Sequence, residues 1–178
     1  INRNYILANK KPLLFTLPIA DLSSFKLIKD TELNSKVYEH WKIKFFKTLE
    51  YNYRKAPCFD TVFSEIKAVF ETKSHLLTDL LFAGIKFVVE YLDLPTQLVR
   101  SSTIYSNSHL SGQERILDIC KKENAKVYYN LSGGKELYCK QAFEQESIAL
   151  QFIKPADSLK YFQFGEESFV PALSFIDV

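Results

Sequence analysis

The spacing of apolar and polar positions predicts strands at the start of the chain. Residues 5–7 and 13–17 are short β-rich runs, separated by polar residues 9–12. This pattern predicts a β-hairpin whose loop is slightly longer than the tightest type. Residues 25–29 alternate in part between apolar and polar side chains and predict an additional edge strand.

The next segment has the periodicity of amphipathic helices. Ser35 is the expected N-cap of the first helix, and Pro57 places the end of that helix near residue 56. Residues 59–70 and 76–92 carry similar apolar stripes and predict two further helices, with Gly84 allowing close packing in the middle of the last. The apolar stripe of the first helix has one residue in every four: Trp41, Phe45, Leu49 and Tyr53.

Beyond Pro95, predicted strands alternate with predicted helices. The order is a strand at 97–100, a helix from 112 to about 123, a strand at 126–129, a helix at 140–145 and a strand at 149–153. Such alternation is typical of parallel β–α–β units. The fold class predicted for the whole chain is α/β, with an N-terminal β-hairpin, a central helical block, and C-terminal β–α–β units that form a mostly parallel sheet.

Composition narrows the class of protein. The chain has 178 residues, of which 47% are hydrophobic, and this is sufficient for one globular domain with a core. Its 23 basic and 21 acidic residues show no basic cluster, which argues against nucleic acid as a partner. No apolar run approaches the ~20 residues of a membrane-spanning helix, so no integral membrane segment is expected. Three widely spaced cysteines argue against a disulfide framework and favour the cytoplasm.

One candidate anion site combines Ser101 and Ser102 with residues 112–115. A helix that begins near Gly112 would present unpaired backbone N–H groups, and Arg115 would add a bidentate contact to phosphate or carboxylate. In the alternative interpretation, Ser111 and Glu114 form a capping box and Arg115 is a solvated surface residue. The two interpretations are compatible, because a capped helix can also line a pocket.

A second candidate loop, Ser132-Gly133-Gly134-Lys135, follows a predicted strand. Paired glycines let backbone N–H groups turn toward an anion, and Lys135 would complete the site. The spacing matches neither a P-loop nor a dinucleotide-binding motif, so a simple turn is the alternative.

Other residue types give weaker signals. The three histidines and three cysteines lack metal-ligand spacing, so no metal site is predicted. Cys120 falls on an apolar helix face and is expected in the core, whereas Cys139 is expected near the surface without an assignable base. Glu166 and Glu167 form either an acidic pair or an ordinary solvated loop.

Several segments, in the same order along nearly the whole chain, resemble those of the WbqC-like protein family. The segments are residues 1–4, 14–18, 55–59, 112–117 with Cys120, 128–130, 133–138, 152, 161–163 and 169–177. Each segment alone is short, and the specificity lies in their order. The resemblance implies a single WbqC-like domain over residues 1–178, without an N-terminal segment and an extreme C-terminus that family members carry.

The family is associated with bacterial gene clusters for O-antigen and other surface polysaccharides. The resemblance therefore implies a cytoplasmic transferase that modifies a nucleotide-linked sugar by acyl or amino-acyl transfer, with a nucleotide sugar or acyl-CoA as substrate. It identifies neither a cofactor nor an oligomeric state. A non-enzymatic module that binds sugars or scaffolds other enzymes is the alternative, favoured by the high content of Phe and Tyr.

The resemblance and the two loops together give a set of candidate site residues. Glu114 and Asp177 are the predicted catalytic residues, although Asp177 is also a candidate helix cap. The predicted substrate-binding residues are Asn2, Arg3, Gln113, Arg115, Ser132, Gly133, Gly134 and Lys135.

Overall fold

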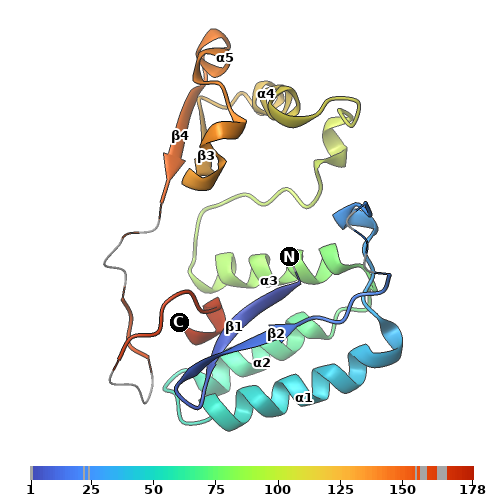
Figure 1. Cartoon of the computed structure of the whole chain (residues 1–178), viewed down its shortest axis with the longest axis vertical. Coiled ribbons are helices and arrows are strands. Elements are labelled where there is room, and N and C mark those ends of the chain that lie inside the picture. Colours follow the sequence, from blue (N-terminus) through green and yellow to red (C-terminus); the bar gives the residue numbers. More distant parts are fainter. Residues whose placement is uncertain (1, 22, 24, 155, 157–159, 164–167) are drawn as a thin grey trace. The chain divides into compact units, whose positions relative to one another are not determined.

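The computed structural model describes residues 2–21, 23, 25–154, 156, 160–163 and 168–178. The candidate acidic pair Glu166 and Glu167 lies outside these residues. The chain divides into two compact units, which are described separately (Figure 1): unit 1 comprises Ile1–Leu98 with Lys160–Val178, and unit 2 comprises Val99–Leu159. Helices combine with an antiparallel hairpin and a parallel strand pair, which confirms the predicted α/β class. The single domain remains a prediction.

Unit 1 begins with the predicted hairpin. Strands β1 (Arg3–Ala8) and β2 (Lys11–Thr16) are antiparallel, with Ala8 opposite Lys11. The loop therefore contains only Asn9 and Lys10, at φ 49° and 65°. Positive φ at both positions is the geometry of the tightest hairpin turn, because its twist matches that of the strands. The prediction of a longer loop was wrong, because Lys11 and Pro12 belong to β2.

Three helices pack with the hairpin in unit 1 (Figure 1): α1 (Ser35–Tyr53), α2 (Phe59–Phe70) and α3 (Leu77–Tyr91). Their predicted positions are confirmed, but the N-cap of α1 is Asn34 and not Ser35, because the Asn34 side chain accepts the Lys36 N–H. The core contains Ile6, Leu17, Leu33, Tyr38, Phe45, Leu49, Ile66, Phe70, Leu77 and Leu80, with Trp41 packed against it.

Two predicted strands are absent from the described structure. Phe25 is 95% exposed, and Ile28–Asp30 forms a 3-10 helix. Segment 25–29 therefore has no buried face, which an edge strand on a core requires. Segment 97–100, the second predicted strand, has an irregular backbone. None of the strands in the described part of the chain lies beside it to form a hydrogen-bonded pair.

Gly84 lies in the middle of α3 without close neighbours. A Cβ placed there would meet no heavy atom within 4 Å, so the predicted role in close packing was wrong.

We expect Gly84→Ala to raise the free energy of unfolding by about 0.5–1 kcal/mol, because alanine has a higher helix propensity than glycine. Chemical denaturation followed by Trp41 fluorescence measures the change. Gly112→Ala is the contrasting variant, and because Gly112 has φ +50° it is expected to destabilise unit 2. A loss of stability in Gly84→Ala would contradict the open environment.

Unit 2 contains one parallel β–α–β unit (Figure 1), as predicted. Strands β3 (Val127–Leu131) and β4 (Ala149–Ile153) are parallel, and the connection between them contains a 3-10 helix (Ser132–Leu137) and α5 (Lys140–Gln145). The unit also contains a 3-10 helix, Ser102–Tyr105, and α4 (Gly112–Lys122). Among the described residues, the core of unit 2 consists of Cys120, Phe143, Ile148 and Leu150. The predicted buried position of Cys120 is therefore confirmed.

Candidate functional site

The pocket in unit 1 that contains Asp177 is the best-defined candidate site. Asp177 ends a short 3-10 helix, Phe175–Asp177, and lines a pocket of about 380 Å³. The other lining residues are mostly apolar or aromatic and come from the end of α1, the α1–α2 connection, α2, the end of α3 and the C-terminal segment. They include Tyr53, Pro57, Cys58, Phe59, Val62, Phe63, Tyr91, Phe162 and Phe175. Asp177 therefore supplies a carboxylate to a largely apolar wall.

Three donors hold the Asp177 carboxylate. The Tyr53 hydroxyl donates to Oδ1 at 2.7 Å, and the Tyr161 hydroxyl donates to Oδ2 at 2.8 Å. The Gln163 side-chain amide donates to Oδ2 at 2.9 Å. A carboxylate has about four acceptor positions, so Oδ1 keeps one for a ligand hydroxyl or amine. These bonds differ from those of a helix cap, which accepts backbone N–H groups.

The donors are themselves fixed by backbone contacts. The buried Gln163 accepts the Val170 N–H at 2.7 Å and donates to the Val170 carbonyl at 2.8 Å. The Tyr53 hydroxyl accepts the Leu7 N–H at 2.7 Å, which joins the end of α1 to β1. Asp177 is consequently held in one orientation, as expected of a residue that must meet a ligand in fixed geometry.

Burial and the Asp177 carboxylate determine the protonation of the two tyrosines. Burial first, and then the hydrogen bond to Asp177, raise the pKa of Tyr161 to about 12. The same two causes raise the pKa of Tyr53 well above its ordinary value. Both hydroxyls therefore stay protonated near neutral pH and donate to Asp177.

The sequence did not identify these partners as site residues. Tyr53 was assigned to an apolar helix stripe, and Tyr161 and Gln163 entered only as part of the family resemblance. Their two-residue separation was the available signal, because it places both polar side chains on one side of an extended segment, where Tyr161 is half-buried and Gln163 is buried.

Asn2 and Arg3 lie in unit 1 beside a different pocket. They contribute to the lining of an apolar cavity of about 420 Å³, together with residues of β2, α2 and α3. The Asn2 side chain donates to the Leu17 carbonyl at 2.8 Å and so continues the hairpin. Arg3 is exposed at the start of β1. Their predicted contacts with substrate remain predictions.

Arg115 forms a hydrogen-bonded network within unit 2. Its Nε donates to Asn107 Oδ1 at 3.1 Å, and one terminal nitrogen donates to Ser102 Oγ at 3.0 Å. Asn107 is 1% exposed and donates to Asp118 Oδ2 at 2.7 Å. The solvated alternative for Arg115 was therefore wrong, because its guanidinium attaches segment 102–107 to α4. Anion binding by Arg115 remains a prediction.

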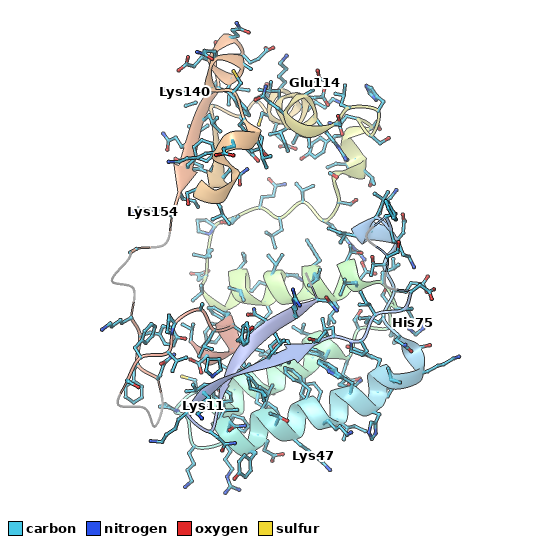
Figure 2. All side chains as sticks on the ribbon, in the orientation of Figure 1. Lys11, Lys47, His75, Glu114, Lys140 and Lys154 are labelled. Carbon is cyan, nitrogen blue, oxygen red and sulfur yellow. The ribbon has the colours of Figure 1, made fainter. Side chains whose placement is uncertain are left out.

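The predicted capping box at the start of α4 is not formed. Ser111 occupies the N-cap position, but its side chain makes no capping hydrogen bond. Glu114 is exposed on α4 (Figure 2). Gln113 instead accepts the backbone N–H of Cys139 and thereby joins the first turn of α4 to the segment before α5. This bond connects Gln113 of the first candidate loop to the N-cap residue of α5, which follows the second loop in the chain.

The second loop differs from the predicted glycine turn. Ser132–Leu137 is a 3-10 helix, and neither Gly133 nor Gly134 has a positive φ. The alternating backbone geometry that forms an anion nest is therefore missing. Lys135 is exposed, with its Nζ 6.0 Å from the centre of the Phe152 ring. Binding of phosphate by Ser132, Gly133, Gly134 or Lys135 remains a prediction.

The described part of the chain offers neither a cluster of metal-ligating side chains nor a helix suited to a membrane. The described residues contain no group of three or more His, Cys, Asp or Glu side chains that would hold a metal ion. None of the helices formed by these residues is both long and apolar enough to cross a membrane.

Comparison with known proteins identifies a family. The family model of the WbqC-like protein family matches residues 1–178, which is the whole chain. No curated protein and no solved structure matches it significantly.

Proposed function

This chain belongs to the WbqC-like protein family, and we propose that it is a cytoplasmic transferase of bacterial surface polysaccharide biosynthesis. Its substrate is a nucleotide-linked sugar, which it modifies by acyl or amino-acyl transfer. The family's association with O-antigen gene clusters supports the pathway. The main structural support is the Asp177 carboxylate, which three donors orient on the wall of an apolar pocket.

In this proposal, Asp177 receives the proton of the attacking group. Transfer from a thioester forms a C–O or C–N bond to the sugar and breaks the C–S bond of the donor. The attacking hydroxyl or amine donates to the open position on Asp177 Oδ1 and transfers its proton there, and the proton passes to the leaving thiolate. The apolar wall around Asp177 strengthens these contacts by excluding water. Glu114, the second predicted catalytic residue, lies in unit 2, and its catalytic role remains a prediction.

We propose, independently of the Asp177 step, that Lys135 of unit 2 contacts phosphate. Nucleotide sugars and acyl-CoA both carry diphosphates, which exposed cations bind. Lys135 is a better candidate than Arg115, because two nitrogens of Arg115 already donate within the unit.

A thermal-shift panel tests this proposal. The ligands are UDP-, dTDP- and CMP-linked sugars, acyl-CoAs and ATP, each added to the full chain. A ligand at about 100 times its dissociation constant raises the free energy of unfolding by about 2.7 kcal/mol. We expect a shift with one class of nucleotide sugar, reduced in Lys135→Ala.

Lys126→Ala is the matched control. Lys126 is an exposed lysine of the same unit that directly precedes β3, at the opposite end of the strand from the 132–135 loop. Equal losses in the two variants would reject a specific role for Lys135. No shift with any ligand would reject a nucleotide-linked substrate and favour the scaffolding module.

A further inference from the structure

A polar pocket at the tip of the hairpin has the composition of an anion site. The pocket has a volume of about 320 Å³ and lies between the β1–β2 turn and the C-terminal end of α1. Its lining contains three cationic side chains and no Asp or Glu. The lining residues are Leu7, Asn9, Lys10, Tyr51, Asn52, Tyr53, Arg54 and Lys55.

The three cations have no acidic partner among the residues that the structure describes. Lys10, Arg54 and Lys55 are all exposed, and none forms an ion pair with the residues that the structure describes. By contrast, Lys42 of the same unit pairs with Glu39 and Glu71, and Lys86 pairs with Glu90. Three unpaired positive charges around one concave surface attract an anion of matching charge.

Hydrogen bonds fix the walls of this pocket. Asn52 accepts the Asn9 N–H at 3.3 Å and donates to the Thr48 carbonyl at 2.8 Å, so the hairpin turn is attached to α1. Tyr53 accepts the Leu7 N–H, which makes a second connection between the same two elements. The cations therefore project from a preorganised frame, which lowers the entropy cost of binding.

The polar pocket adjoins the Asp177 pocket through Tyr53. Tyr53 lines both, and residues 54 and 55 of the polar pocket are followed directly by Ala56, Pro57 and Cys58 of the other. An elongated ligand with an anionic end and a less charged end would fit this arrangement.

We propose that Lys10, Arg54 and Lys55 bind the diphosphate ester of a substrate whose reactive end occupies the neighbouring Asp177 pocket. The inference rests on the proposed function for the identity of that substrate, and it adds a phosphate site in unit 1. A diphosphate carries two to three negative charges near neutral pH, which the three cations neutralise. Both a soluble nucleotide and a membrane lipid can supply this group.

Isothermal titration calorimetry of the full chain with inorganic diphosphate tests the site without requiring turnover. The site variant is K10Q/R54Q/K55Q. The matched control is K36Q/K44Q/K47Q, which removes three exposed lysines of α1 that form no ion pair among the described residues (Lys47 in Figure 2). We expect the site variant to lose at least about tenfold in affinity and the control less than about twofold. Raising the salt from about 50 to about 200 mM should weaken wild-type binding.

The results of this titration distinguish whether the site exists, which molecule supplies the diphosphate, and whether the chain is a transferase. Equal losses in the two variants, or no binding of diphosphate to the wild type, would overturn the site. Competition by UDP identifies a nucleotide as the source of the diphosphate, and competition only by vesicles that contain a polyprenyl diphosphate identifies a lipid. Diphosphate binding that depends on the three cations, in a chain without transfer activity, would reject the transferase and retain the site.

Discussion

Replacing Phe143 with alanine is expected to lower the free energy of unfolding of unit 2 by about 3–5 kcal/mol. Phe143 is 0% exposed, and its ring stacks on Tyr128 at 5.6 Å and meets Tyr138 edge-on at 5.9 Å. Among the described residues, the core of this unit has three other buried members, Cys120, Ile148 and Leu150, so few buried side chains are available to fill the resulting cavity. The loss is comparable to the whole stability of a small domain.

Hydrogen exchange read by mass spectrometry measures this effect in peptides from residues 140–153. Trp41, the only tryptophan, lies in unit 1 and reports on that unit by fluorescence in the same sample. Phe143→Leu is the control, because it keeps most of the buried area and should cost less than the alanine variant. Unchanged protection of β4 in Phe143→Ala would show that the ring does not support the core.

Replacing Asp177 with asparagine is expected to reduce kcat/KM for sugar modification by about 10²–10⁴-fold. The substitution preserves the shape but removes the negative charge that accepts the proton. It also places an NH₂ group against one or more of the hydroxyl and amide donors that now surround the carboxylate. Initial rates with the nucleotide sugar selected by thermal shift measure the change.

A pH titration provides a second readout of Asp177→Asn. In the wild type, Tyr161 has a pKa of about 12, raised first by burial and then by Asp177. Absorbance near 295 nm should therefore show this tyrosine ionising at a lower pH in the variant. Asp60→Asn, at an exposed carboxylate in the first turn of α2, is the control and should change neither property. An Asp177→Asn variant with wild-type rates would rule out proton transfer at this residue.

Local patterns were sufficient to predict most of the secondary structure. The stripe that includes Trp41 and Leu49 indicated α1 because burial follows the helical period, and α5 and β4 were predicted at their observed bounds. Segment 25–29 shows the limit of this reasoning. Its partial alternation resembles that of a strand, but a strand also needs a partner, which periodicity does not reveal.

The candidate site was harder to predict because its contacts join distant parts of the chain. Asp177 was identified as a candidate, but Tyr53, which donates to it, is 124 positions away. Arg115 was expected to face an anion, yet it is held by the buried Asn107, which no motif indicated. Side-chain hydrogen bonds of this kind depend on tertiary geometry, and local spacing does not encode them.

Mass spectrometry of a transfer reaction decides whether this chain is a transferase. The wild type and Asp177→Asn are incubated with the nucleotide sugar that stabilises the fold and with a mixture of acyl-CoAs. We expect the wild type to give a sugar product heavier by one acyl group, together with free CoA, and Asp177→Asn to give neither above background. A wild type that binds the sugar but leaves every donor intact would contradict acyl transfer from CoA and support the non-enzymatic sugar-binding module.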